Sequence, residues 1–96
     1  MRITAIKIFP LKIPRGKVRA FASIILDDFI MIRDFKVIEG RKGVFVGFPT
    51  RKITDGVFRE IIQPVDSIAD QTIKEAIIRA YEDEMARPEN SLEKKI

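Results

Sequence analysis

Two residue types are missing from this 96-residue chain, which contains no cysteine and no histidine. Without cysteine there is no disulfide, no thiolate metal site and no thiol nucleophile. Without histidine the chain lacks the commonest general acid–base group and metal ligand. An enzyme would have to work with carboxylates, lysine, tyrosine or serine alone. The composition therefore argues against a catalytic function.

Long apolar runs are also missing. No stretch approaches the ~18 consecutive apolar residues that a membrane-spanning helix needs. The N-terminus alternates polar and apolar residues and lacks a signal-peptide core, so we expect a cytoplasmic protein without a membrane span. A chain of this length supports one hydrophobic core. We predict a single domain over residues 1–87, followed by a charged and frayed tail over residues 88–96.

Recognisable catalytic and cofactor motifs are absent as well. The chain has neither a glycine-rich phosphate loop nor a motif centred on a serine nucleophile. Its carboxylate groupings, Asp27–Asp28 and Asp55, fall where turns are expected and lack the surrounding pattern of a calcium loop. We therefore expect no cofactor, no metal and no small-molecule substrate.

Charge is distributed unevenly along the chain. The net charge is +4, but residues 1–60 hold thirteen Lys and Arg against six Asp and Glu, whereas residues 61–96 hold five against eight. A basic front and an acidic rear are typical of proteins whose front binds a polyanion. A solvated surface of mixed charge explains the asymmetry equally well.

Apolar alternation predicts a β-rich first half. The expected strands cover residues 3–11, 18–26, 29–38 and 44–48, with a short fifth strand over 57–62. Turns are expected at Pro14–Gly16, Asp27–Asp28 and Gly40–Gly43, and their close spacing favours antiparallel pairing. Residues 49–56 are predicted to form a loop. Gly47 indicates either a bulge or a close approach of two backbones.

A single helix is predicted over residues 67–86. Its apolar stripe repeats with helical spacing and consists of Ile73, Ala76, Ile77, Ala80 and Tyr81. Ser67 or Asp70 is expected at its N-cap, and Pro88 follows its end. The fold class expected from these elements is α+β, a small antiparallel sheet of four to five strands followed by one amphipathic helix.

The third expected strand carries large apolar residues on both faces. Phe35 and Val37 alternate with Ile32 and Ile38, but one helix covers only one face of a sheet. A second subunit is the simplest cover for the other face, so we expect a homodimer. A β-bulge that switches the inward face midway along the strand is the competing explanation.

Four sequence motifs follow one another between residues 19 and 64. The first is R-A-F-A-S-I-I-L-D at residues 19–27, and the second is I-R-D-F-K-V-I-E-G at residues 32–40. The third is G-V-F-V-G-F-P-T-R-K at residues 43–52, and the fourth is D-G-V-F-R-E-I-I-Q-P at residues 55–64. In this order and spacing the motifs resemble those of the SpoVG family of septation proteins (stage V sporulation protein G). The chain departs from the family pattern at Ile53–Thr54, where Thr-Pro is common, and at Gln63, where His is common.

This resemblance implies a dimeric regulator that binds DNA and RNA. It also implies a link to division-septum formation, sporulation and control of gene expression. In the family the basic pair after the Pro-Thr step is tied to nucleic-acid binding, and here that pair is Arg51 and Lys52. A protein-interaction adaptor in cell division, without direct nucleic-acid binding, is the alternative function. It would use the sheet edge or the acidic helix residues Glu75, Glu82, Asp83 and Glu84.

The candidate nucleic-acid contacts are basic or polar residues near the expected loop. Arg51 and Lys52 can reach phosphates from the loop, with Thr50 donating a further hydrogen bond. Arg41 and Lys42 form a second basic turn, and Arg59 either binds phosphate or pairs with Asp55 or Glu60. A third basic cluster consists of Arg15, Lys17 and Arg19, of which Arg15 and Lys17 are expected to be ordinary turn residues. Phe45 and Phe48 could stack on bases, but we expect both to pack in the core.

Overall fold

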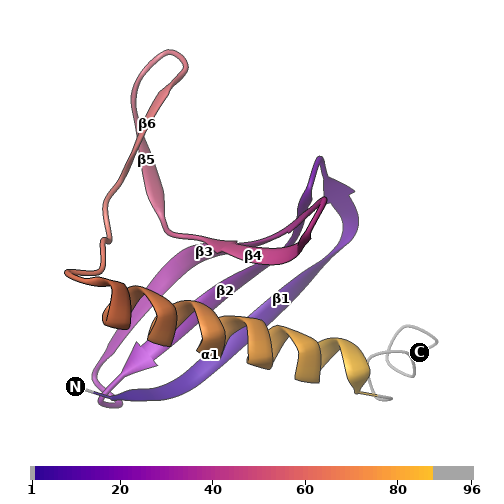
Figure 1. Ribbon diagram of the computed structural model, residues 1–96, viewed down its shortest axis with the longest axis vertical. Helices are drawn as coiled ribbons and strands as arrows, with labels where there is room; N and C mark the ends of the chain where they lie inside the picture. Colours follow the sequence, from indigo (N-terminus) through magenta and orange to yellow (C-terminus); the bar gives the residue numbers. More distant parts are fainter. Residues whose placement is uncertain (1, 88–96) are drawn as a thin grey trace.

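The computed structural model describes residues 2–87, in which an antiparallel sheet carries a helix on one face and a two-stranded arm at one end (Figure 1). The α+β class is confirmed. The predicted tail over residues 88–96 lies outside the described residues. The elements are β1 (Ile3–Arg15), β2 (Val18–Leu26), β3 (Ile30–Gly40), β4 (Gly43–Gly47), β5 (Thr50–Thr54), β6 (Val57–Glu60) and α1 (Ser67–Ala86).

The main sheet is a meander with the strand order β1-β2-β3-β4, and every neighbouring pair is antiparallel. Short turns join the strands, as their spacing predicted. Asp27 and Asp28 form one of these turns, and both have φ of 53°, a left-handed conformation that Asp tolerates. The Asp27 carboxylate accepts a hydrogen bond from the Arg2 backbone at 2.8 Å. Asp28 contributes its backbone N–H, which donates to Thr4 Oγ1 at 2.9 Å, so both residues serve the turn, as predicted.

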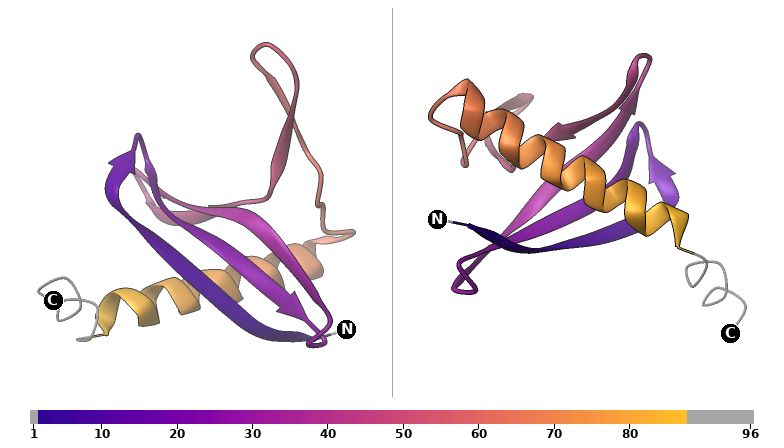
Figure 2. Two further views of the ribbon diagram at one scale, coloured as in Figure 1. Left: turned by 180° about the vertical axis from the view of Figure 1, so that it is seen from behind. Right: turned by 60° about the horizontal axis from the view of Figure 1, so that its bottom comes forward.

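The core lies between the sheet and α1 (Figure 2). Ala20 and Ala22 on β2 are fully buried beside Phe35 and Val37 on β3. Ile77 is the buried residue of α1, and Ile73 and Tyr81 of the predicted stripe pack against the core with it. Ile78, which the predicted stripe did not include, packs there as well. Phe48 closes one end of the core, where its ring meets the Phe35 ring edge to face at 5.3 Å between centroids. Such a pair adds about 0.5–1.5 kcal/mol to the burial of its two rings.

A β-bulge in β3 explains much of the apolar alternation on both faces. Ala22 is opposite Phe35 and Ile24 is opposite Ile32, so the bulge places two β3 residues, Arg33 and Asp34, beside one β2 residue. Asp34 has φ of 73°. Because of the extra residue, both Ile32 before the bulge and Phe35 after it point toward the core, although they are three positions apart. The bulge alternative is thus confirmed.

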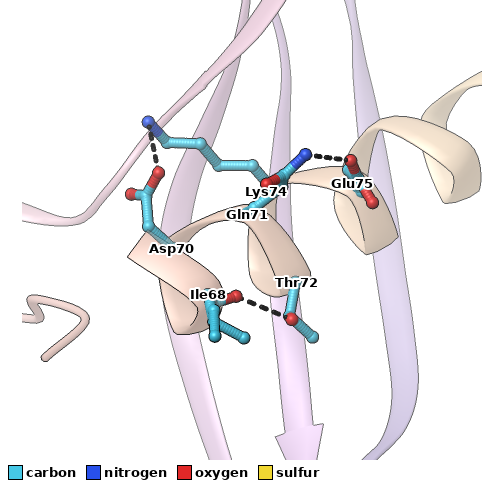
Figure 3. A network of polar contacts seen from close by, with 6 residues as sticks. All are labelled: Ile68, Asp70, Gln71, Thr72, Lys74 and Glu75. Carbon is cyan, nitrogen blue, oxygen red and sulfur yellow. Dashed lines mark hydrogen bonds and ion pairs between the residues drawn. The ribbon is translucent and has the colours of Figure 1, made fainter. Parts of the chain in front are cut away.

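Polar contacts stabilise the first turns of α1. Asp66, rather than the predicted Ser67 or Asp70, is the N-cap, and its carboxylate accepts from the Ala69 backbone N–H at 2.8 Å. Asp70 instead forms an ion pair with Lys74 at 3.3 Å, and the Gln71 amide donates to Glu75 at 2.8 Å (Figure 3). The Lys74 ammonium also lies 5.9 Å from the centre of the Phe48 ring, which ties the helix to the end of the core.

Candidate functional site

A two-stranded arm, residues 50–60, extends away from the sheet and the helix (Figure 1). The predicted loop over residues 49–56 is wrong for Thr50–Thr54, because this segment is β5 and pairs antiparallel with β6. Asp55 and Gly56 form the turn between them, and Gly56 has φ of 77°. Side-chain alternation alone did not reveal β5 because, apart from Ile53, its residues are polar.

The arm is anchored at its base and exposed along its length. Phe48 and Pro49 are buried just before β5, and the Ile61 N–H donates to the Pro49 carbonyl oxygen at 2.9 Å. Every residue from Thr50 to Glu60 is exposed. The buried base holds the arm in place, while its side chains are available to a partner.

Arg51 and Arg59 are directly opposite each other on the arm. Opposite residues of an antiparallel pair share one face, with Cβ atoms ~4.5–5.5 Å apart. Neither guanidinium forms an ion pair with any described residue, so the predicted pairing of Arg59 with Asp55 or Glu60 is not found. Two like charges in this position destabilise the hairpin. A bound anion would remove that cost by bridging both guanidinium groups.

Lys52 points to the other face of β5, because successive strand residues alternate. Its cross-strand partner is Phe58, and its ammonium pairs with Asp55 at 3.3 Å. The two cations that are adjacent in the sequence are therefore separated by the strand. The structure joins Arg51 with Arg59 instead, a pairing that could be found from sequence only once the hairpin register was known. Thr50 lies at the base of the arm, opposite Glu60.

The second predicted cluster lies elsewhere. Arg41 and Lys42 form the exposed turn before β4, whereas the arm follows β4, so the two basic regions are at opposite ends of that strand. The β1–β2 turn with Lys17 lies beside Arg41 and Lys42, since the Lys17 carbonyl oxygen accepts from the Glu39 N–H at 2.9 Å. Arg19 of the third cluster pairs with Glu39 at 2.8 Å.

The two aromatic candidates, Phe45 and Phe48, lie in different environments. Phe48 is buried in the core, as predicted, with 4% of its surface exposed. Phe45 is 51% exposed and lies on the sheet face opposite α1, so its predicted core position is wrong. Gly47 marks neither a bulge nor a close approach of two backbones. β3 and β4 pair in continuous register, and the atom nearest to a Cβ at position 47 would be the side-chain atom Ile38 Cδ1, at 3.3 Å.

Other kinds of site find little support in residues 2–87. No group of three or more carboxylates in this range is arranged to hold a metal ion. Among the described helices none has the length and apolar character to cross a membrane. The acidic residues of α1 contribute to local contacts, with Glu75 bonded to Gln71 and Glu84 paired with Arg87 at 3.2 Å.

The fold and the arm define a class of small α+β proteins in which a four-stranded meander presents an exposed basic hairpin. The SpoVG family model matches residues 1–83, and the chain belongs to the SpoVG family. It is 39% identical over 88 residues to a protein of Phytoplasma australiense named "Putative septation protein SpoVG", covering 92% of this chain and 91% of the relative. Proteins of the same name from Bdellovibrio bacteriovorus and Agathobacter rectalis are each 40% identical over 85 residues. These matches cover 88% of this chain, and 77% and 97% of the respective relatives.

Proposed function

We propose that this protein is a regulatory nucleic-acid-binding protein of the SpoVG type, which acts in septum formation, sporulation and control of gene expression. The observation that supports binding is the cross-strand pair of Arg51 and Arg59, held on an exposed arm without an acidic partner among the described residues. The link to septation rests on the name that the relatives share.

The phosphate backbone of DNA or RNA is the ligand that this pair fits. Arginine presents planar donors that match phosphate oxygens in bidentate geometry. Both side chains are solvent-exposed, so binding requires little desolvation. Contacts of this kind position a protein on a nucleic acid without reading its sequence. Thr50 and Lys52 lie on the opposite face of the arm, with Phe58, so the arginine pair provides the phosphate contacts.

We also propose that the protein is a homodimer whose subunits meet through the arm. An isolated two-stranded hairpin is marginally stable in water. This arm and its base nevertheless expose four large apolar side chains by 45–63% of their surface: Ile53, Val57, Phe58 and Ile61. Phe58 lies on the face opposite the two arginines. A second copy packed against the Phe58 face would cover apolar surface and leave both arginine pairs free for phosphate.

Salt dependence tests the proposed contacts. If a dimer neutralises about four phosphates with Arg51 and Arg59 of both arms, the slope of log K against log salt is roughly −3.6. Binding of a fluorescein-labelled mixed-sequence duplex, measured by anisotropy, should weaken on the order of a hundredfold between 50 and 200 mM salt. A labelled RNA hairpin measured in parallel gives the preference between DNA and RNA.

Two double variants with the same loss of charge distinguish binding by the arm from non-specific binding by the net positive charge. Arg51→Ala with Arg59→Ala should weaken duplex binding roughly tenfold or more, about 1.4 kcal/mol. The control, Arg2→Ala with Lys12→Ala, removes the same charge from β1 and its N-terminal side, at the sheet edge away from β4, and should have a small effect. Equal losses in both double variants would show that net charge, rather than the arm, binds. Salt-insensitive or absent binding by the wild type would favour the adaptor function.

A further inference from the structure

The sheet face opposite α1, here called the outer face, carries aromatic and basic side chains together. In the left view of Figure 2 the sheet lies in front of α1, with this face toward the reader. Phe9 and Phe45 are 52% and 51% exposed, and Phe21 is half-buried. Half-exposed phenylalanines on a sheet face are an unusual use of large apolar side chains, since aromatic rings dominate the energetics of cores and interfaces.

The strand register brings these groups into neighbouring rows. Phe9 is directly opposite Phe21, and Phe21 is directly opposite Lys36 on β3. The next row contains Lys7 opposite Ser23, which lies beside the bulge with Arg33. Phe45 occupies the β4 end of the face, opposite Ile38. Its ring rests against Gly40, where a Cβ atom would come within 3.1 Å of Phe45 Cε1.

A shallow hollow lies in the middle of this face. It has a volume of about 350 Å³, and its lining includes Lys7, Phe9, Phe21, Met31 and Arg33. This volume is near the lower end of the ~300–1,000 Å³ range of small-ligand sites. Aromatic rings and cations therefore border the same depression.

The charge of the outer face is positive. Lys7, Arg33 and Lys36 form no ion pair with any described residue, whereas Arg19 is neutralised by Glu39 at 2.8 Å. Asp34, in the bulge, is an acidic residue of this face and also lines the hollow. Two copies packed face to face would bring the unpaired cations together, which is unfavourable. A polyanion with flat apolar groups complements both the charge and the rings.

We infer that the outer face binds single-stranded nucleic acid, with bases stacked on Phe9, Phe21 and Phe45 and phosphates contacted by Lys7, Arg33 and Lys36. This inference rests on the proposed nucleic-acid function and adds a second surface to the arm. Bases of a single strand can leave their own stack and lie on aromatic side chains, whereas duplex bases are paired and enclosed. The arm contacts the phosphate backbone of both single-stranded and duplex nucleic acid, whereas the outer face binds the single strand selectively.

A tryptophan reporter tests the stacking directly, because the chain contains no tryptophan. Phe45→Trp places a single indole on the outer face, and stacked bases should quench its fluorescence when a 12-nucleotide single strand is added. Phe29→Trp is the control, since Phe29 is 86% exposed in the β2–β3 turn. Quenching at position 45 but not at 29 supports the inference. Equal quenching at both positions, or none at 45 despite measurable binding, overturns it.

Affinity measurements on matched probes complete the test. Phe9→Ala with Phe45→Ala should weaken binding of single-stranded RNA and DNA of one sequence, by about five- to a hundredfold for each lost stack. Duplex affinity should change less than twofold, and circular dichroism should stay the same because both rings are half exposed. Unchanged single-strand affinity overturns the inference, as does a change of molar mass in light scattering, which would identify the face as a self-association surface.

The arm variant distinguishes this inference from the proposed function. Arg51→Ala with Arg59→Ala should weaken binding of both the single-stranded and the duplex probe, and a wild type that binds neither probe contradicts the proposed function itself.

Discussion

At the residue scale, Arg51 and Arg59 combine an unfavourable local arrangement with an exposed position. Like charges opposite each other on a hairpin cost stability, and no acidic side chain in the described part of the chain offsets them. Proteins keep such local costs where a ligand removes them. The cross-strand pair is therefore a better candidate for anion binding than the adjacent pair of Arg51 and Lys52 in the sequence.

Arg59→Glu tests this trade between stability and binding. The introduced carboxylate would pair with Arg51 across the hairpin and stabilise the arm by about 0.2–1 kcal/mol. We expect slower amide hydrogen exchange over residues 50–60 together with weaker duplex binding than in Arg59→Ala. Faster exchange in the arm would show that the two arginines are not opposed as described.

The backbone of Asp34 forms part of the bulge in β3. Its φ of 73° lies in the left-handed region, which is costly for β-branched side chains. Asp34→Val should lower the free energy of unfolding by about 1–2 kcal/mol, whereas Asp34→Gly should leave it unchanged or raise it slightly. Urea denaturation measures both. Equal stability of the two variants would contradict a left-handed backbone at position 34.

At the element scale, α1 depends on packing more than on its own sequence. The helix ends with no basic residue in its last turn, and one residue, Ile77, is fully buried against the sheet. Most helical stability in proteins comes from such an apolar face. The polar contacts of Figure 3 add smaller local contributions at the exposed side.

Substitutions at two isoleucines of α1 test how much its packing contributes to stability. Ile77→Ala should lower the free energy of unfolding by about 2–5 kcal/mol, because a fully buried side chain is lost from the core. Ile68→Ala is the matched control, and its 76% exposure should limit the effect to about 0.5 kcal/mol. Thermal and urea unfolding followed by circular dichroism measure both. Similar losses would show that α1 is not docked through Ile77.

At the scale of the whole molecule, the sheet, helix and arm present two surfaces of different chemistry. The arm carries an arginine pair on one face and Phe58 on the other. The outer face of the sheet carries exposed rings and cations. A dimer formed through the Phe58 face would double the number of arginine pairs, and binding through linked sites gains affinity without any new contact.

The dimer predicts a molar mass of about twice the 11.0 kDa of one chain in light scattering after size exclusion. Phe58→Glu should shift that mass toward one chain, because a charge would enter the apolar contact. Phe29→Glu, a change at a similarly exposed phenylalanine outside the arm, should leave the mass unchanged. A wild type that elutes as a single chain would contradict the dimer, and duplex binding would then show a salt slope of about −1.8.

The amino-acid sequence by itself determined the elements that local patterns encode. Helical spacing of the stripe through Ile77 predicted α1 at its observed bounds, and strict alternation predicted β2 over residues 18–26. Turn residues such as Asp27 and Asp28 indicated where the chain reverses. These features follow from neighbouring residues, so they can be read without knowing the fold.

Only the tertiary structure decided which distant residues share a face. β5 has a single apolar residue, Ile53, so no periodic pattern revealed the hairpin that places Arg51 beside Arg59. The bulge at Asp34 shifts the alternation by one position, which no propensity specifies. Phe45 and Phe48 are three residues apart, so strand alternation sends them to opposite faces, but only the pairing of β4 with β3 and the position of α1 decide that Phe48 is the buried one. Strand register depends on pairing across the sheet, and a shift of one residue exchanges the two faces.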